Sequence, residues 1–307
     1  MEIHFAPIQG HTDTIYREAF RKFFGGLDSF YTPFIRVERG AIRNKDLREL
    51  ENGVNEQNLV PQIMAGNAQE LRLLVERVAE YGYRHIDINM GCPFPMITGA
   101  GKGAGILAKP EKVKEVLDCI KEFSGLEFSL KVRLGYESCS NLFELIPYLN
   151  TLPLRHLTVH PRTAKQQYKG EVHIDEFAKI YECSTLPLIY NGDLKSVADI
   201  ARIVSDFPNL KGIMIGRGLL ENPMLAENYL FGDEVQSADF KQRVVKFHGE
   251  LLERYSGVLQ GEHQILKRMQ SLWEYLRNPN GDERILKKLK KCTSMPKYLG
   301  MVAEYLK

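Results

Sequence analysis

The chain has 307 residues, of which 44% are hydrophobic and 26% charged, with 41 Lys and Arg against 39 Asp and Glu. These proportions are those of a globular protein and exclude a disordered, collagen-like or low-complexity chain. No apolar run approaches the roughly 18 residues of a membrane-spanning helix, and Met1–Pro7 lacks the basic and apolar regions of a secretory signal. We therefore expect a cytoplasmic protein without membrane attachment.

Short runs of β-branched and apolar residues predict eight strands in the first 235 residues. They are Glu2–Ala6, Ser29–Thr32, Leu59–Ile63, His85–Asn89, Phe128–Arg133, His156–His160, Pro187–Asn191 and Gly212–Ile215. Most intervals between them hold an amphipathic helical pattern, such as Ala68–Ala79, and this alternation predicts a parallel sheet. Eight units in this length fit an α/β fold of the closed (β/α)8 TIM barrel type, which takes about 250 residues. An open, doubly wound sheet is the alternative, with fewer strands.

The C-terminal ends of the predicted strands carry polar side chains. In a (β/α)8 barrel these ends form the functional site, and their polar groups would be costly to bury in an ordinary core. They include Gln9, Gln62, Asn89, Lys131, Arg133, His160, Arg162, Asn191, Asp193 and Arg217. Any one of them could simply complete a hydrogen bond at a strand end, but together they predict a site at the barrel mouth.

The interval between the fourth and fifth predicted strands is the longest because it contains the glycine-rich segment Met90–Gly105. This segment predicts a loop without helix propensity, whose backbone can approach a ligand closely. It is not a phosphate-binding P-loop, because Gly103 follows Lys102 where Ser or Thr is required. Cys92 in this loop is the suspected reactive group.

Phosphate binding fits better at the loops after the seventh and eighth predicted strands. Asn191–Asp193 and Gly216–Gly218 offer backbone N–H donors there, and Arg217 adds a guanidinium. The five cysteines form no C-x-x-C pair, so no zinc or thioredoxin-like motif is present and we expect no metal.

Residues 236–307 predict a small C-terminal helical bundle. Helical patterns run over Phe240–Tyr255, Glu262–Leu276, Glu283–Lys291 and Pro296–Leu306. This region has 14 Lys and Arg against 8 Asp and Glu, whereas residues 1–235 have 27 against 31. A basic bundle suggests a polyanionic partner, and a solvated helix face is the alternative. We expect two domains, 1–235 and 236–307.

Six short motifs resemble those of the tRNA-dihydrouridine synthases, flavin enzymes that reduce uridines in tRNA, and they occur in that family's order. They are Ala6–Asp13, Asn89–Pro93, Lys131–Arg133, His160–Thr163, Asn191–Asp193 and Ile215–Gly218. The resemblance covers nearly the whole barrel and is weaker in the tail. It implies a catalytic domain with FMN across the barrel mouth, NADPH as reductant and a helical tRNA-binding domain. We expect the enzyme to be a monomer.

The resemblance also implies roles for individual residues. Pro7, Ile8 and Gln9 would lie beside the flavin ring, Gln62 and Lys131 at its polar edge, and His160 near flavin and base. The phosphate would be held by Asn191, Gly192, Asp193, Gly216 and Arg217. Cys92 matches the family's acid, which protonates uracil C5 while flavin delivers a hydride to C6. A thiol with its ordinary pKa of about 8.5 is mostly protonated at neutral pH and suits this role. A barrel-interior ion-pair role is the alternative for Lys131 and Arg133.

The tRNA contacts follow in the same way. Asn89 and Tyr168 match positions that contact a uridine drawn out of its stack. Arg36, within Thr32–Val37, resembles a stretch of the bacterial subgroup that acts on D-loop position 16. Lys267, Arg268, Lys287, Lys288, Lys290 and Lys291 are expected to contact phosphates. Gln9, His11 and Pro95 depart from the commonest family pattern, and many members carry Lys where this chain has Pro95.

Three other functions remain possible at this point. A flavin barrel acting on a small molecule, such as a dihydroorotate dehydrogenase-like protein, would not explain the basic helical extension. A non-catalytic RNA-binding barrel would not explain why Cys92, Lys131, His160 and Arg217 occur together. An aldolase-type barrel using Lys131 as a Schiff base is the third, and borohydride trapping would test it.

Overall fold

The computed structural model describes residues 1–53, 56, 58–232, 240–278 and 281–307. The chain divides into two compact units. The barrel unit comprises Met1–Gln9, Asp28–Asp193 and Ile203–Ile215, and the helical unit comprises Gly10–Leu27, Leu194–Arg202 and Gly216–Lys307. The predicted domain boundary between residues 235 and 236 lies outside the described residues. Of the helices that are described, none is long and apolar enough to cross a membrane.

One sheet forms the centre of the barrel unit. Its strands are β1 (Glu2–Phe5), β2 (Ser29–Tyr31), β3 (Ile35–Glu38), β4 (Ala41–Ile42), β5 (Leu59–Val60), β6 (Gln62–Met64), β7 (His85–Met90), β8 (Glu127–Gly135), β9 (Leu154–Thr163), β10 (Leu188–Tyr190) and β11 (Gly212–Ile215). They pair in the order β4-β3-β6-β7-β8-β9-β10-β11-β1-β2-β5. Each pair is parallel except β3 with β4.

The sheet is closed, because β2 and β3 are the two halves of one interrupted strand, and β5 and β6 are the two halves of its neighbour. β2 pairs with β5 and β3 pairs with β6, on either side of Thr32–Phe34 in one strand and Pro61 in the other. Proline lacks the N–H that a ladder needs, which explains the break at Pro61. Counting each interrupted strand once gives the predicted (β/α)8 barrel. The eight expected strands are all present, whereas β3 beyond Pro33 and the short β4 were not predicted.

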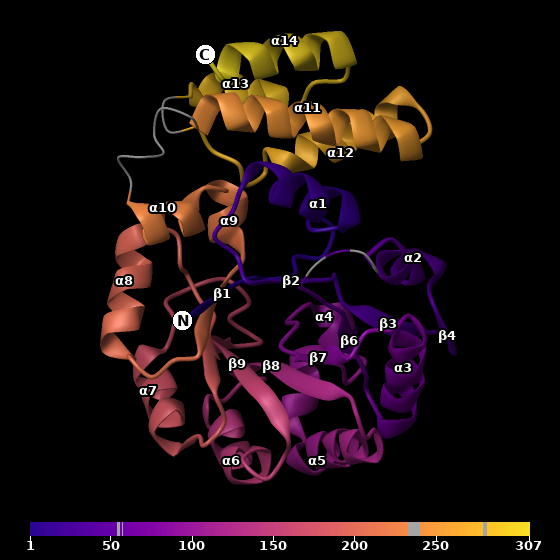
Figure 1. Cartoon of the computed structure of the whole chain (residues 1–307), viewed down its shortest axis with the longest axis vertical. Coiled ribbons are helices and arrows are strands. Elements are labelled where there is room, and N and C mark those ends of the chain that lie inside the picture. Colours follow the sequence, from indigo (N-terminus) through magenta and orange to yellow (C-terminus); the bar gives the residue numbers. More distant parts are fainter. Residues whose placement is uncertain (54–55, 57, 233–239, 279–280) are drawn as a thin grey trace. The chain divides into compact units, whose positions relative to one another are not determined.

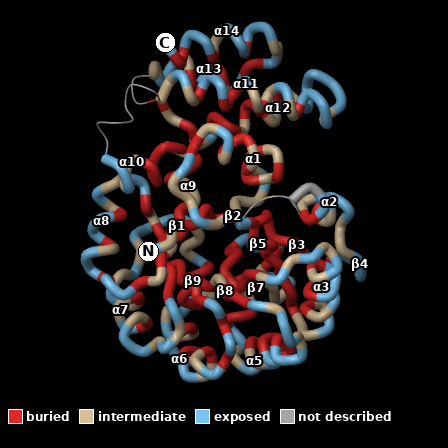
Figure 2. Tube along the Cα trace, in the orientation of Figure 1, coloured by how far each residue is buried: buried red, intermediate tan, exposed pale blue. Residues whose placement is uncertain are grey.

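Helices follow the strands of the barrel unit (Figure 1). They are α2 (Asn44–Gly53), α3 (Ala68–Glu80), α4 (Pro95–Thr98), η1 (Gly103–Ala108), α5 (Pro110–Asp118), η2 (Cys119–Glu122), α6 (Ser140–Leu149) and α7 (Ile174–Cys183), with α8 (Val197–Asp206) shared by both units. In α3 the Asn67 side chain accepts from the Glu70 N–H, at 2.8 Å, and caps the helix. Its Leu71, Leu74 and Val78 are buried, which gives the helix one apolar face toward the strands (Figure 2).

The prediction that Met90–Gly105 has no helix is wrong, because the segment contains α4 and the start of η1. Pro95 occupies the first position of α4, where the missing N–H of proline costs no hydrogen bond. Ile97 is buried and packs with Cys92, Phe34 and Met64, so an apolar contact stabilises this short turn.

Three buried or half-buried histidines lie near the N-terminal ends of β1, β7 and β9. His4 Nδ1 is 2.9 Å from the Tyr31 hydroxyl, which is 3.5 Å from His156 Nε2. The His156 ring lies 5.7 Å from the rings of both His4 and His85. Burial lowers the pKa of His85 to about 4 and that of His156 to about 2.

This cluster predicts acid sensitivity of the folded state. The unfolded histidines titrate near 6.5, so below that pH the unfolded chain binds more protons than the folded chain. The stability that His85 and His156 contribute is therefore complete above pH 6.5 and is lost as the pH falls toward their folded-state pKa values. The urea concentration at the midpoint of unfolding should fall when the pH is lowered from 7 to 5. This decrease should be smaller in His156→Gln. In His263→Gln, the control at an exposed position, it should equal the decrease in the wild type. Equal midpoints at pH 7 and 5 would contradict this.

The helical unit contains α1 (Thr14–Phe23), α9 (Arg217–Glu221), α10 (Leu225–Phe231), α11 (Phe240–Val258), α12 (Glu262–Leu272), α13 (Glu283–Leu289) and α14 (Met295–Tyr305). The four predicted tail helices are therefore present as α11–α14. Phe247 of α11 packs against Tyr16 and Phe20 of α1 at ring distances of 5.3 and 6.4 Å. The buried Tyr298 hydroxyl lies 2.8 Å from both Trp273 Nε1 and His248 Nε2. Sequence patterns did not predict that α1 packs with these helices.

Candidate active site

Lys131 of β8 projects toward the loop after β10. Its Nζ donates to Asn191 Oδ1 at 2.7 Å, and Asn191 Nδ2 donates to the Met214 carbonyl at 2.7 Å. Burial lowers the pKa of Lys131 to about 8, and the nearby Arg133 charge acts in the same direction. The acceptor of the Lys131 hydrogen bond is thus a neutral amide, which leaves the ammonium charge available to an anionic ligand.

A buried hydrogen-bond chain connects β6, β7 and β8 to the Cys92 loop. Ser129 Oγ donates to Asp87 Oδ1 at 2.6 Å, and Gln62 Nε2 donates to Asp87 Oδ2 at 2.7 Å. Asn89 Nδ2 then donates to Gln62 Oε1 at 2.7 Å. The Asn89 Oδ1 accepts from the N–H groups of Gly91 and Cys92, both at 3.0 Å. Gln62 and Asn89 therefore fix the backbone that carries Cys92.

Cys92 is a free thiol with 7% of its surface exposed. It packs with Phe34, Met64 and Ile97. Burial raises the pKa of its thiol, while a backbone hydrogen bond and the charge of Arg133 act in the opposite direction. A protonated thiol suits a proton donor, whereas a nucleophilic cysteine requires a lowered pKa.

Gly103 fixes the approach of the loop to Cys92. Its φ is +55°, and a Cβ at this position would lie 2.7 Å from the Cys92 carbonyl oxygen. The loop is also closed by Ala104 N–H, which donates to that oxygen at 3.0 Å, and by the ion pair of Lys102 with Glu70 at 2.8 Å.

Gly103→Ala should therefore destabilise the fold and lower activity. The substitution combines left-handed strain with a backbone clash, so we expect about 2–4 kcal/mol loss in unfolding free energy from urea titration. Gly101→Ala is the matched control, because Gly101 has φ +70° but nothing within 4 Å of its Cβ position. Equal losses in the two variants would show that contact with Cys92 is unimportant.

Arg133 of β8, His160 of β9 and Tyr168, which follows β9, lie together. The fully buried Arg133 donates to the carbonyls of Gly91, at 2.9 Å, and Gln167, at 2.7 Å. Its guanidinium lies 5.3 Å from the Tyr168 ring centroid, and that ring lies 6.2 Å from the His160 ring. Tyr168 is 41% exposed, so its ring can contact a ligand while Arg133 supports it.

The two loops predicted to bind phosphate belong to different units of the chain, Asn191–Asp193 to the barrel unit and Gly216–Gly218 to the helical unit. A Cβ on Gly192 would come within 3.1–3.3 Å of Val172, Tyr190 and Pro161, so only glycine fits there without movement. Asp193 has a φ of 44° and pairs with Arg162. Gly216 directly follows β11 and precedes α9, which Arg217 begins, in the helical unit.

The loop after β1 places Pro7, Ile8 and Gln9 half-buried. Gln9 Oε1 is buried and has no hydrogen-bond partner among the residues that the structure describes. A buried amide oxygen without a donor is costly. Gln9 therefore marks a position where a ligand N–H would be stabilising.

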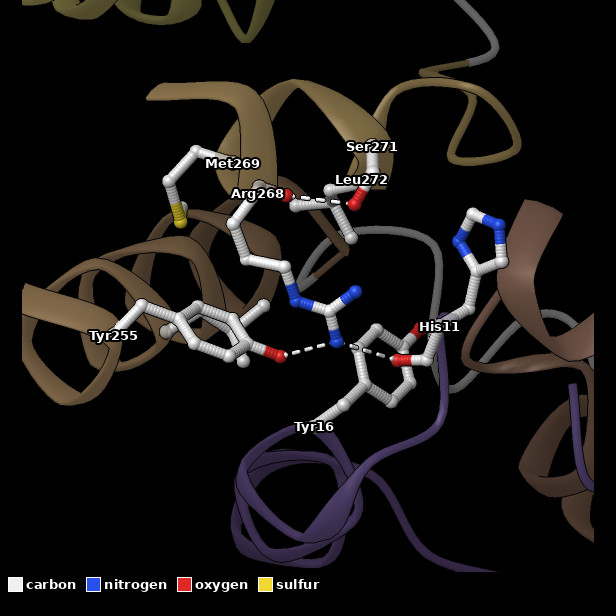
Figure 3. A pocket seen from close by; sticks show the side chains of 8 residues that line it. His11, Tyr16, Tyr255, Arg268, Met269, Ser271 and Leu272 are labelled. Carbon is white, nitrogen blue, oxygen red and sulfur yellow. Dashed lines mark hydrogen bonds between the residues drawn. The ribbon is translucent and has the colours of Figure 1, made fainter. Parts of the chain in front are cut away.

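The basic residues expected to contact tRNA divide into exposed and half-buried ones. Lys267, Lys287, Lys288 and Lys291 are exposed, and Lys290 is half-buried. Arg36 is half-buried on β3, with Nη2 3.3 Å from Glu38 Oε2. Arg268 instead lines a small pocket of the helical unit with Tyr16, Tyr255 and His11 (Figure 3). There it donates to Asp13 at 2.6 Å, the Tyr255 hydroxyl at 2.7 Å and the His11 carbonyl at 3.1 Å.

Sequence reasoning placed Arg162 among the polar strand-end residues but assigned no individual role to it or to Asp87. Asp87 precedes Asn89 by two residues in β7, and Arg162 follows His160 by two in β9. Since side chains two apart share a face of a strand, this spacing was the available signal.

The family model for dihydrouridine synthases (Dus) matches residues 4–300 of this chain. The tRNA-dihydrouridine synthase B of Pasteurella multocida is 30% identical over 271 residues, covering 84% of this chain and 80% of that protein. The tRNA-dihydrouridine(16) synthase of Pseudomonas syringae pv. tomato is 30% identical over 235 residues, covering 74% of each chain. The old yellow enzyme from Trypanosoma cruzi, at 10% identity and a TM-score of 0.55, covers 75% of this chain and 88% of its own and shares the fold.

Proposed function

The chain belongs to the dihydrouridine synthase family, and from this premise we propose that it is a flavin-dependent tRNA-dihydrouridine synthase. It reduces the C5–C6 bond of a D-loop uridine in tRNA, with NADPH as the source of electrons, as a cytoplasmic monomer. The observation that carries this proposal is the buried Cys92, whose backbone N–H donates to Asn89, in the same barrel unit as the buried Lys131–Asn191 hydrogen bond.

The residues of the barrel unit fit a flavin. Gln9 has a buried amide oxygen that needs a donor, and the polar edge of the flavin ring carries an N–H. Lys131 supplies a cation where negative charge develops on a reduced flavin. In this proposal Pro7 and Ile8 lie beside the ring.

The phosphate of FMN is assigned to Asn191–Asp193 together with Gly216 and Arg217. The Asp193 carboxylate is already paired with Arg162, and like charges repel, so its backbone N–H suits the phosphate better than its side chain. Arg217 adds a charge that can bind phosphate oxygens in a bidentate manner.

The protein residues supply the proton and the position of the base. When bound, reduced FMN supplies the hydride that forms the new bond at uracil C6. Cys92 donates its proton to C5, is left as a thiolate, and regains a proton from solvent before the next turnover. Tyr168 offers an exposed aromatic ring for a base drawn out of its stack, and Asn89 orients the loop that carries the acid.

Anaerobic reoxidation of the bound flavin tests this function. The holoenzyme is reduced with NADPH, mixed with unmodified tRNA, and followed by flavin absorbance. We expect reoxidation by unmodified tRNA and none by the same tRNA after complete modification. Reoxidation by orotate and not by tRNA would instead support the small-molecule flavin enzyme.

Substitution of the adjacent residues Lys267 and Arg268 tests which of them belongs to the tRNA-binding surface. Lys267 is exposed, whereas Arg268 is half-buried and paired with Asp13. Lys267→Gln should weaken tRNA binding at low salt and reduce the slope of log K against log salt by about 0.7–0.9. Arg268→Gln should lower the thermal stability of the protein, because it removes the ion pair with Asp13 and the hydrogen bond to the Tyr255 hydroxyl. Equal slopes for wild type and Lys267→Gln would exclude Lys267 from the binding surface.

A further inference from the structure

Arg162 lies in the barrel unit with 1% of its surface exposed and belongs to β9, two residues after His160. Its Nη1 is 3.2 Å from His160 Nε2. Its Nη2 donates to the Gly170 carbonyl at 2.6 Å and to the Asp193 carboxylate. The half-buried Asp193 carboxylate, the buried Arg162 guanidinium and the buried His160 imidazole are therefore connected by consecutive hydrogen bonds.

The chemistry of the guanidinium determines the protonation of the imidazole. Arginine stays charged in proteins, and each of its nitrogens can only donate. Nε2 of His160 must then accept from Nη1, so it carries no hydrogen. A neutral imidazole with its hydrogen on Nδ1 is the state that satisfies this contact.

We propose that Arg162, held by Asp193, is a positioning residue that fixes His160 as the neutral Nδ1–H tautomer. This inference rests on the proposed function for its catalytic meaning, because the family resemblance implies that His160 lies near flavin and base. With Nε2 occupied, Nδ1–H becomes the hydrogen-bond donor of the ring. His160 can then donate to an acceptor atom of the flavin or the uracil without adding positive charge.

The same contacts explain the conformation of the loop after β10. Asp193 adopts a φ of 44°, which is uncommon for a residue with a side chain. Its carboxylate faces the buried Arg162 charge in this conformation, and a buried charge without a partner would be strongly destabilising. The loop assigned to phosphate and the histidine on β9 are thus joined through one side chain.

Nuclear magnetic resonance of the histidine rings tests the tautomer without any substrate. The holoenzyme is labelled with ring-15N histidine, and the His160 signals are identified by their loss in His160→Gln. At pH 7.5 we expect a protonated Nδ1 and an unprotonated Nε2. A protonated Nε2 in the wild type overturns the proposal.

Variants separate positioning from simple structural support. Arg162→Met should allow the hydrogen to move to Nε2, whereas Arg162→Lys, which still donates, should keep the wild-type pattern. Arg155→Met is the control on the same strand, because Arg155 is surface-exposed and pairs with Glu127, and it should leave His160 unchanged. If Arg162→Met does not fold, Arg162→Met with Asp193→Asn removes both charges. An unchanged pattern after loss of the guanidinium also overturns the proposal.

Turnover distinguishes this inference from the proposed function. Loss of the Arg162 donor should lower kcat for tRNA reduction by about 10- to 100-fold, with partial rescue in Arg162→Lys. A wild type that shows the Nδ1–H pattern but does not reduce tRNA would contradict the proposed function and leave the tautomer assignment intact. A tRNA-reducing wild type with an Nε2–H pattern would do the reverse.

Discussion

Replacement of Cys92 by alanine should lower the rate of uridine reduction by about 10²- to 10⁴-fold while the protein stays folded and binds FMN. In the proposed mechanism the Cys92 thiol is the proton donor, and burial favours its protonated form by raising its pKa. Alanine fits the apolar contacts with Phe34, Met64 and Ile97 but cannot donate. The rate is measured as flavin reoxidation by unmodified tRNA after reduction with NADPH.

Cys119→Ala is the control for this experiment. Cys119 is also buried, and its Sγ donates to the Val116 carbonyl at 3.1 Å. It begins η2 and does not belong to any of the predicted strand ends. We expect this variant to turn over at close to the wild-type rate. Flavin reduction by NADPH should be the same in both variants, because it requires no protonation of uracil. A wild-type rate in Cys92→Ala would remove Cys92 from the mechanism.

Lys131 should give the affinity for FMN a dependence on pH. Burial lowers the pKa of Lys131 to about 8, so the ammonium that favours an anionic ligand is lost as the pH rises through this value. The association constant for FMN should therefore be constant below pH 7 and fall by up to about tenfold per pH unit above 8. Fluorescence titration of the apoprotein with FMN from pH 6.5 to 9.5 measures this fall.

Lys131→Met should bind FMN more weakly and remove that fall. Lys211→Met is the control, since Lys211 pairs with Glu2, at 3.8 Å, beside the first residue of β11. It should keep both the affinity and the pH dependence of the wild type. The same decline with pH in Lys131→Met would assign the titration to another group.

The barrel could be predicted from sequence because its signal is local. Strands repeat at a nearly constant interval, and each strand needs only its own apolar run to be found. The interruption of two strands at Pro33 and Pro61 was not found, since pairing of β3 with β6 depends on residues about 28 positions apart. Helix α4 was missed for a similar reason, because burial of Ile97 against Phe34 and Met64 stabilises it in a glycine-rich segment.

Candidate site residues could be named from the sequence by their type and position, but their hydrogen-bond partners could not. The sequence places Gln62 and Asn89 at strand ends, yet only the structure joins them through one hydrogen bond at 2.7 Å. Arg268 and Lys267 are adjacent and equally basic, and the internal partner of Arg268 is Asp13, 255 residues away. Charge patterns cannot separate such a pair, because they carry no information on long-range contacts.

The most direct test of the proposed function is the mass of the product. Purified protein is incubated with NADPH and unmodified tRNA, and nuclease fragments are weighed by mass spectrometry. The proposed activity predicts that one D-loop fragment gains two hydrogens with wild-type protein and with Cys119→Ala, and not with Cys92→Ala. No gain in any tRNA fragment, from protein that binds FMN and oxidises NADPH, would contradict it.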